Sequence, residues 1–200
     1  MTFGARKVLL CIASLCYALP ATAPAQPLPH GSAQPSSSGL PFAIGDARAI
    51  VLFFVSSDCP ISNRLLPEML RIESEFATRR IRFFFIYPNS AETPATIRAH
   101  RIAYDLGAKD NTLTDPHESL AKLTGANVTP EASILIPNGT TLKPLYTGRI
   151  DDRYISLGAE RPAATRHDLE DAIAALLANH PVPPPGGPPV GCAFTTLATK

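Results

Sequence analysis

The cysteine at position 59 follows a run of seven apolar residues, 49–55, and is itself followed by a proline. An uninterrupted apolar run predicts a strand that is buried on both faces, as in the centre of a parallel sheet. Pro60 suits the first position of a helix, because its missing N–H would have no intrahelical acceptor there. The sequence therefore predicts a strand that passes into a helix, with Cys59 at the junction. At a helix N-terminus the dipole and the free N–H groups favour the thiolate over the thiol.

The remaining apolar pattern alternates between strands and helices. Apolar runs predict core strands over 48–57, 81–87 and 132–136, a short strand at 113–114, and a returning strand at 141–146. Helical spacing predicts helices over 59–76, 93–106 and 117–123, and a last helix from an N-cap at Thr165 to about 179. We expect Ile97, Ile102 and Leu106 on one buried face, and a kink at Pro67. This order predicts an α/β domain in which a mixed sheet carries helices on both faces.

The two ends of the chain differ in composition from its middle. Residues 1–25 combine a short basic segment, an apolar stretch and Ala23-Pro24-Ala25, which is the pattern of a secretory signal peptide. We expect cleavage after Ala25, with Ala23 and an uncleaved anchor as alternatives, and export to the periplasm or the medium. We interpret 26–46 as a flexible linker, 47–180 as the folded domain and 181–200 as a Pro-rich C-terminal tail.

Charge and histidine placement exclude other classes of function. The formal net charge is +1 and no Lys/Arg run is present, so the chain lacks the basic surface of a nucleic-acid-binding protein. His100, His117 and His167 fall in or beside predicted helices, where we expect surface or capping side chains rather than metal ligands. The pattern indicates neither a metal site nor an organic cofactor.

Two proline-containing motifs carry a resemblance to a known family. Cys59-Pro60-Ile61-Ser62 begins a predicted helix, and Thr129-Pro130 directly precedes a predicted strand. Over about 47–192 the chain resembles the thioredoxin-like superfamily, in its exported TlpA/redoxin (AhpC/TSA-like) branch. The resemblance implies a three-layer sandwich, a cis peptide bond before Pro130, and Thr129 and Pro60 as substrate-binding positions beside the catalytic Cys59. It also implies a monomer that acts on a protein thiol, a protein disulfide or a peroxide, with no membrane span once the leader is removed.

Two residues depart from the pattern of that family. Its motif is Cys-x-x-Cys, whereas Ser62 stands at the second cysteine position here, so exchange within the motif is excluded. We expect Ser62 to donate a hydrogen bond to the Cys59 thiolate. Asp58 stands where relatives usually carry Trp, and its carboxylate would raise the pKa of the neighbouring thiol. Ser56, Ser57 and Asp58 predict a polar, solvent-accessible rim around Cys59; an inert, buried cysteine is the alternative.

A second cysteine lies far along the chain, in the tail. Without the leader, the four cysteines become two, Cys59 and Cys192. Ten residues, 181–190, precede Gly191 and are mostly proline, and at about 3 Å per residue they span the radius of a small domain. Cys192 is therefore a candidate resolving partner for Cys59, and an incidental tail thiol is the alternative.

Two further hypotheses stand beside an exported thiol–disulfide oxidoreductase. The first is a binding module that keeps the fold without turnover, which Asp58 and Ser62 favour. The second is a peroxiredoxin-like peroxide reductase, for which Ser56 lies three residues before Cys59 and Arg149 is the candidate peroxide-holding cation. For Arg149 and Arg153 the alternative to reaching the site is a salt-bridged loop.

Overall fold

The computed structural model describes residue 1 and residues 40–106 and 111–195. The predicted signal peptide beyond Met1 and the predicted linker up to residue 39 lie outside the described residues. Within the described ranges, no helix is long and apolar enough to cross a membrane.

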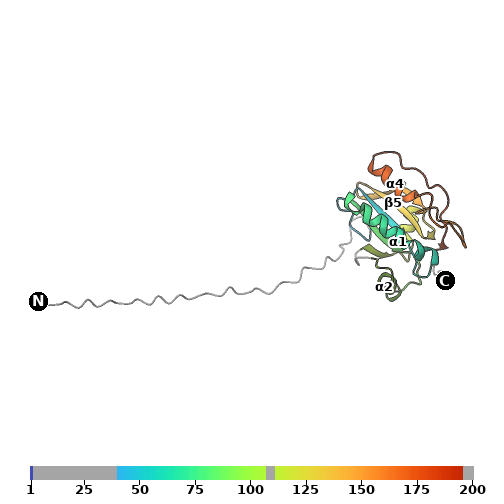
Figure 1. Ribbon diagram of the computed structural model, residues 1–200, viewed down its shortest axis with the longest axis horizontal. Helices are drawn as coiled ribbons and strands as arrows, with labels where there is room; N and C mark the ends of the chain where they lie inside the picture. Colours follow the sequence, from blue (N-terminus) through green and yellow to red (C-terminus); the bar gives the residue numbers. More distant parts are fainter. Residues whose placement is uncertain (2–39, 107–110, 196–200) are drawn as a thin grey trace. The chain divides into compact units, whose positions relative to one another are not determined.

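A five-stranded sheet with the order β3-β2-β1-β5-β6 forms the centre of the domain (Figure 1). Its parallel half consists of β1 (Ala49–Phe54), β2 (Ile81–Tyr87) and β3 (Thr112–Thr114). Its antiparallel half consists of β5 (Glu131–Asn138) and β6 (Thr141–Gly148). Two short antiparallel pairs accompany it: β4 (Val128–Thr129) with β9 (Cys192–Ala193), and β7 (Tyr154–Ser156) with β8 (Ala159–Glu160). The mixed sheet is the predicted one.

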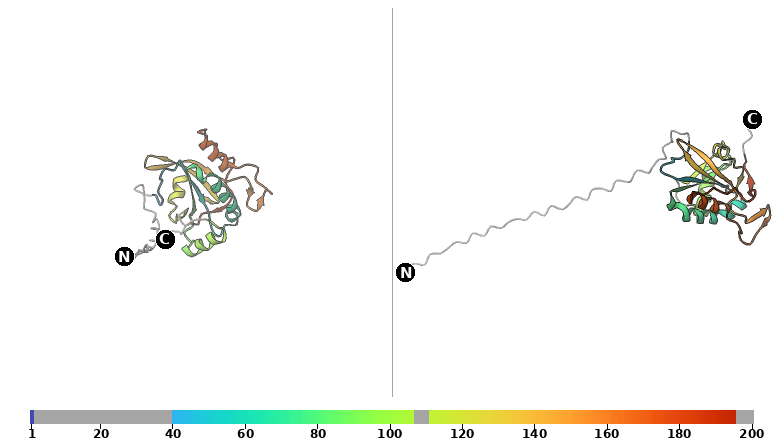
Figure 2. Two further views of the ribbon diagram at one scale, coloured as in Figure 1. Left: turned by 60° about the vertical axis from the view of Figure 1, so that its left-hand side comes forward. Right: turned by 90° about the horizontal axis from the view of Figure 1, so that it is seen from above.

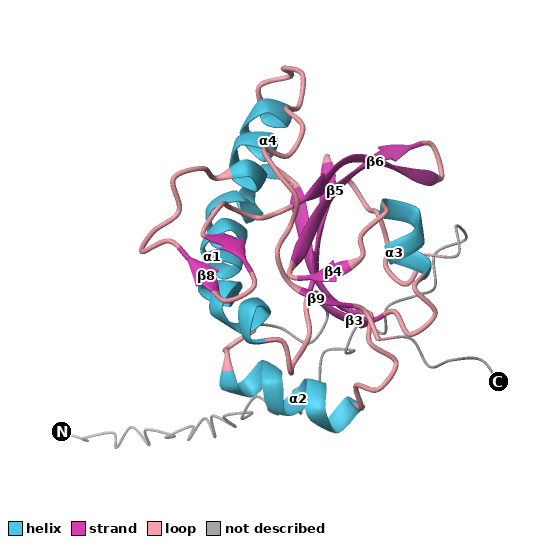
Figure 3. Ribbon diagram, turned by 90° about the vertical axis from the view of Figure 1, so that its right-hand side faces the viewer, coloured by secondary structure: helices cyan, strands magenta, loops and turns pink. Residues whose placement is uncertain are grey.

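The central strand β1 is buried along its whole length because both faces of the sheet are covered. Val51 and Phe53 face a core shared with α1 (Pro60–Phe76), α2 (Pro94–Ala103) and α4 (Asp168–Leu177). Leu52 and Phe54 face a second core, shared with α3 (Ser119–Thr124). Figure 3 shows α1 and α4 on one side of the sheet and α3 on the other. Complete burial of each such side chain stabilises the folded state by about 1.5–3 kcal/mol. Because β1 contributes to both cores, it joins the helices on the two faces of the sheet.

α1 runs to Phe76 with Pro67 inside it, as predicted, and a short 3-10 turn, Ala77–Arg79, follows. One detail of α2 differs from the prediction. Ile102 is 77% exposed rather than on the buried face of α2. The buried positions of α2 are Ile97 and His100, and Leu106 is buried beyond the end of the helix. The spacing of apolar residues favoured Ile102 as the buried position. In the structure His100 faces inward instead, because polar partners are available to it there.

The predicted capping role of Thr165 is wrong. α4 begins at Asp168 with His167 as its N-cap residue. Thr165 instead donates to the buried carboxylate of Asp152, with both its N–H and its hydroxyl at 2.6 Å, and Arg166 N–H adds a third bond at 2.9 Å. Burial alone would raise the pKa of Asp152, but the hydrogen bonds from Thr165 and Arg166 outweigh burial and hold the pKa well below its usual value.

The tail after α4 runs back along the domain to the end of the sheet (Figures 1 and 2, orange to dark red). Gly186 N–H donates to Asp168 at 2.8 Å, and Gly148 leaves room for Pro185, whose Cβ would lie 2.6 Å from any Cβ at position 148. Further on, Thr195 N–H donates to Asn89 at 2.9 Å. The tail is therefore attached at several points before and after Cys192.

Candidate active site

Cys59 is the N-cap residue of α1, as the sequence predicts. Its backbone is extended, at φ −87° and ψ 111°, and Pro60 occupies the start of the helix. No side chain caps this terminus, so the first-turn N–H groups face the region of the sulfur without a capping oxygen. This arrangement combines the positive end of the helix dipole with a cysteine, which is the environment that favours a thiolate.

The sulfur of Cys59 is bonded to Cys192. The two Cα atoms lie 6.1 Å apart, inside the range for a disulfide, although 133 positions separate the residues in sequence. The candidate pairing of Cys59 with Cys192 is thus present in the structure. β9 brings Cys192 to the site, with Thr129 as its direct partner in the antiparallel pair with β4 (Figure 3).

Thr129 and Pro130 stand beside the disulfide, and the bond between them is cis, as the resemblance implies. The Thr129 carbonyl oxygen lies 3.0 Å from Cys59 Sγ. The Thr129 hydroxyl donates to the Cys192 carbonyl at 3.4 Å. Thr129 and Pro130 are both buried. The loop therefore contacts both cysteines of the pair.

The expectation of a solvent-accessible sulfur at Cys59 is wrong for the disulfide state. Cys59 is 1% exposed, and Ser56 and Ser62 are fully buried. Pro60 and Asp58 are exposed, so the polar rim exists, but the sulfur lies beneath it. The physical reason lies in the tail and the Thr129 loop, which sit against the sulfur and cover it. Local sequence does not reveal a cover that comes from 133 residues away.

Ser62 connects the end of β1 to the first turn of α1. Its hydroxyl oxygen accepts a hydrogen bond from Ser56 N–H at 3.3 Å. With Cys59 in a disulfide there is no thiolate to receive a bond, so the expected donation from Ser62 stays a prediction. The side chain lies in the right turn of the helix for it.

Two acidic residues near the site were missed by the sequence reasoning. Glu92 accepts from Ser57 N–H at 2.6 Å, and burial followed by the nearby charge of Asp58 raises its pKa. Glu131 follows the cis proline directly, is 4% exposed, and accepts from Asn127 N–H at 2.8 Å; burial raises its pKa as well. Their positions after β2 and at the start of β5, next to the end of β1, were the available signal.

A buried polar chain links α2 to the loop before Cys59. His100, which we expected at the surface, is 5% exposed. Asn63 donates to the Ser57 carbonyl at 3.1 Å, so its own oxygen accepts from His100 Nε2 at 2.8 Å. His100 Nδ1 lies 2.7 Å from the Tyr87 hydroxyl. Burial lowers the pKa of His100 and so favours the neutral ring, in which Nε2–H donates to Asn63 and Nδ1 accepts from Tyr87.

This histidine predicts a pH dependence of stability. The unfolded chain takes up a proton on His100 near pH 6.5, whereas the folded protein resists it, so the contribution of His100 is complete above pH 6.5 and is lost as pH falls below it. The expected slope is at most about 1.4 kcal/mol per pH unit. Urea unfolding between pH 7.5 and 5 measures it, with His100→Gln as the non-titrating control. Buried carboxylates contribute equally to the pH dependence of both proteins, so they cancel in the comparison. If the unfolding free energy changes with pH equally in the natural protein and in His100→Gln, His100 is not the source of the dependence.

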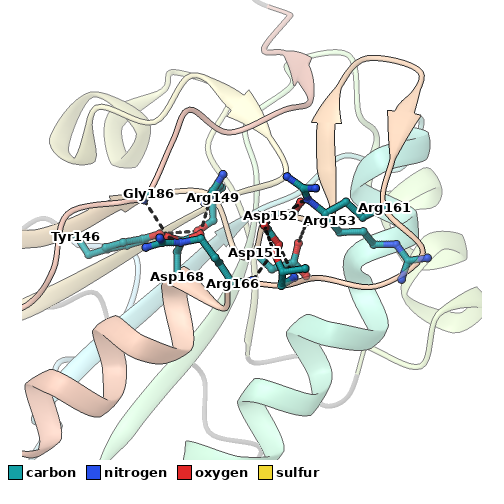
Figure 4. A network of polar contacts seen from close by, with 10 residues as sticks. Tyr146, Arg149, Asp151, Asp152, Arg153, Arg161, Arg166, Asp168 and Gly186 are labelled. Atoms are coloured by element: carbon teal, nitrogen blue, oxygen red, sulfur yellow. Dashed lines mark hydrogen bonds and ion pairs between the residues drawn. The ribbon is translucent and has the colours of Figure 1, made fainter.

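The arginines considered as candidates for the site are occupied elsewhere (Figure 4). Arg149 pairs with the buried Asp168 at 2.6 Å, and Arg153 pairs with Glu160 at 3.4 Å. The salt-bridged loop, which was the alternative interpretation, is confirmed. Ser56, the other residue of the peroxide hypothesis, accepts from Asn89 at 2.8 Å and donates to Asp58. The peroxide hypothesis therefore has no free cation from Arg149.

We expect Asp168 to stabilise the folded protein, because it binds both Arg149 after β6 and the backbone of the tail at Gly186. Replacing it with alanine leaves the Arg149 guanidinium, 15% exposed, without its partner and removes the acceptor of Gly186 N–H. We expect a loss of about 3 kcal/mol in the free energy of unfolding, because an unpaired buried charge is costly. Urea unfolding measures it. Asp171→Ala is the matched control on the same turn of α4, where only the helix-dipole interaction of about 0.3–1 kcal/mol is lost. A loss no larger than the control would contradict the prediction.

One cluster in the described ranges has the composition of a metal site. Ligand atoms of Glu68, His167 and Glu170 lie within 4.8 Å of one another. Arg71 already pairs with Glu68 at 2.8 Å and also pairs with Glu170. The arginine neutralises these carboxylates, so the cluster reads as a surface salt bridge network.

A groove of about 1160 Å³ begins beside the candidate site. One wall of the groove is formed by α1, through Pro60, Asn63, Pro67 and Arg71. The other is formed by the segment after β6, through Asp151, Arg153, Ala163 and Ala164. The groove is therefore continuous with the exposed rim next to Cys59.

No family model matches the chain, and no curated protein matches it significantly. Among solved structures, a hypothetical protein, SMc02350 from Sinorhizobium meliloti 1021, is 25% identical, with a TM-score of 0.65 over 78% of this chain and 84% of that one. An uncharacterized conserved protein from Geobacillus kaustophilus is 26% identical, with a TM-score of 0.61 over 78% and 80%. A secreted disulfide oxidoreductase of Mycobacterium tuberculosis, homologous to E. coli DsbE, is 16% identical, with a TM-score of 0.41 over 66% and 81%.

Proposed function

We propose that this chain, which has a thioredoxin-like fold, is an exported thiol–disulfide oxidoreductase. Cys59 is the exchanging nucleophile and Cys192 the resolving cysteine. The observation that supports this most is the disulfide between them at the N-terminus of α1, beside the cis bond before Pro130. Export is supported by the leader pattern of residues 1–25.

The chemistry is two successive thiol–disulfide exchanges. The Cys59 thiolate attacks one sulfur of a substrate disulfide, a bond forms to that sulfur, and the other substrate sulfur leaves as a thiolate that takes up a proton. The Cys192 thiolate then attacks Cys59 Sγ and expels the first substrate sulfur as a second thiolate. Two electrons pass from the cysteine pair to the substrate. The same steps in reverse oxidise a substrate dithiol.

The neighbouring residues have supporting roles in this proposal. Ser62 accepts from Ser56 N–H, which leaves its own hydroxyl proton for the Cys59 thiolate. Thr129 presents its backbone beside the sulfur, and Pro60 forms the exposed rim that a substrate meets. The tail supplies through Cys192 the function that a second motif cysteine has in Cys-x-x-Cys relatives.

The burial of Cys59 favours a second candidate, a binding module with a structural disulfide. A permanent cross-link also requires a buried cysteine, and Cys59 is 1% exposed. It is likewise consistent with a tail that is attached on both sides of Cys192. The two functions differ in one property, namely whether the disulfide opens in the folded protein.

The deciding experiment is reduction under native conditions. The purified protein is treated with dithiothreitol, and free thiols are counted by maleimide labelling and mass. We expect both cysteines to become accessible without denaturant, and the reduced protein to reduce a model peptide disulfide with formation of one Cys59–Cys192 bond per disulfide consumed. A disulfide that opens only in denaturant would overturn the proposal in favour of the binding module.

A further inference from the structure

The tail segment 191–194 lies along the edge of β4, and its residues Cys192–Ala193 form the strand β9. Ala193 pairs with Val128 and Cys192 with Thr129, in antiparallel register. Phe194 N–H extends the pairing by donating to the Asn127 carbonyl at 3.3 Å. An extended segment that adds to a strand edge beside a reactive group is a recurrent mode of peptide recognition.

Two positions of this segment are matched to the surface beneath them. A Cβ on Gly191 would lie 2.2 Å from the Thr129 carbonyl oxygen, so no side chain fits there without displacing backbone. Phe194 packs its ring against Phe54, with centroids 5.9 Å apart, and joins the second core. Between them, Ala193 is exposed, so that position accepts a larger side chain.

The same edge is the approach to the sulfur of Cys59. Because Cys59 is 1% exposed while the tail is in place, an external cysteine reaches it only when the tail has left. The departing segment uncovers the backbone of Val128 and Thr129 and the ring of Phe54. The site that an incoming cysteine meets therefore has the shape of the segment that has just vacated it.

We propose that Gly191–Phe194 is an internal copy of the substrate, so that the substrate is an extended segment of another protein with glycine before its cysteine and an aromatic residue two positions after it. This inference rests on the proposed oxidoreductase function. Substrate and tail bind in turn: the substrate cysteine forms the mixed disulfide with Cys59 on the vacant β4 edge, and the return of Cys192 to that edge expels it with the electron balance given above.

The test uses peptides of residues 189–195 whose cysteine carries a thionitrobenzoate leaving group, so that attack by Cys59 releases a coloured thiolate. The protein is the reduced Cys192→Ser variant. Four peptides are compared: the natural sequence, a glycine-to-valine change at 191, a phenylalanine-to-alanine change at 194, and an alanine-to-valine change at 193. The last adds bulk at an exposed position and is the matched control.

We expect the natural and Ala193→Val peptides to react at similar rates. The Phe194→Ala peptide should react about tenfold more slowly, because it loses the contact of a half-buried aromatic ring with Phe54. The Gly191→Val peptide should react only as fast as a peptide of scrambled sequence. Equal rates for all four peptides, with Cys59 still reacting, would overturn the substrate assignment and leave the oxidoreductase proposal standing. No reaction with any peptide or with small aromatic disulfides would remove the proposed function itself.

Discussion

A Cys192→Ser variant is expected to stall as a mixed disulfide on Cys59, while a Cys59→Ser variant forms no adduct at all. In the natural protein Cys192 is tethered to the domain by the tail, so its return to Cys59 and the second exchange are intramolecular. Tethered groups act at effective concentrations of about millimolar. Resolution by an external thiol at micromolar concentration should therefore be slower by about three orders of magnitude.

Acid quenching followed by intact mass spectrometry measures this result. The Cys192→Ser protein should carry the mass of one substrate chain, which disappears on reduction, and peptide mapping should place the adduct on Cys59. The Cys59→Ser protein controls for reaction of Cys192 alone. Adduct formation on Cys192 in the Cys59→Ser protein, at the rate seen for the other variant, would exchange the two roles and contradict the assignment.

Opening the disulfide is expected to lower the free energy of unfolding by about 5 kcal/mol. The bond closes a loop that spans 133 positions of sequence, and in the chain-entropy description a loop of that length restricts the unfolded ensemble by about this amount. The reduced protein should keep its central sheet, because the two cores lie almost wholly within 40–180. The loss should therefore appear as an earlier cooperative transition rather than as loss of the fold.

Urea unfolding of the oxidised and the reduced protein measures the difference. A Cys192→Ala variant is the control, since it should unfold at the reduced midpoint whether or not reductant is present. If the oxidised and reduced proteins unfold at the same urea concentration, the disulfide contributes nothing to stability. The bond would then act in exchange alone.

Local features of the sequence predicted much of the frame of the site. The apolar run before Cys59 and the proline after it predicted the strand–helix junction, and both are present. Gly125 ends α3 with φ +82°, a left-handed conformation that glycine adopts more readily than other residues. Each of these features depends on residues a few positions apart, so a short stretch of sequence contains all the interactions involved.

The errors arose where the partner of a residue is remote. Thr165 looks like a helix cap, but its hydroxyl is used by Asp152, 13 residues earlier. His100 looks like a surface residue, but Tyr87 and Asn63 supply hydrogen-bond partners for both ring nitrogens and so offset the cost of burying them. A polar side chain is buried only where hydrogen-bond partners are available to it. The packing of helices and strands, and not the neighbouring sequence, determines which partners those are.

For this protein, the sequence by itself determined that a cysteine begins a helix at the end of a buried strand and that a second cysteine follows a proline-rich tail. Only the tertiary structure decided that the two meet, that β4 and β9 pair, and that the sulfur is covered. The first kind of information depends on backbone preferences and apolar periodicity within one or two turns of chain. The second depends on where the packing of the helices, strands and loops places Asp168, Asn89 and Thr129, the groups to which the returning tail binds.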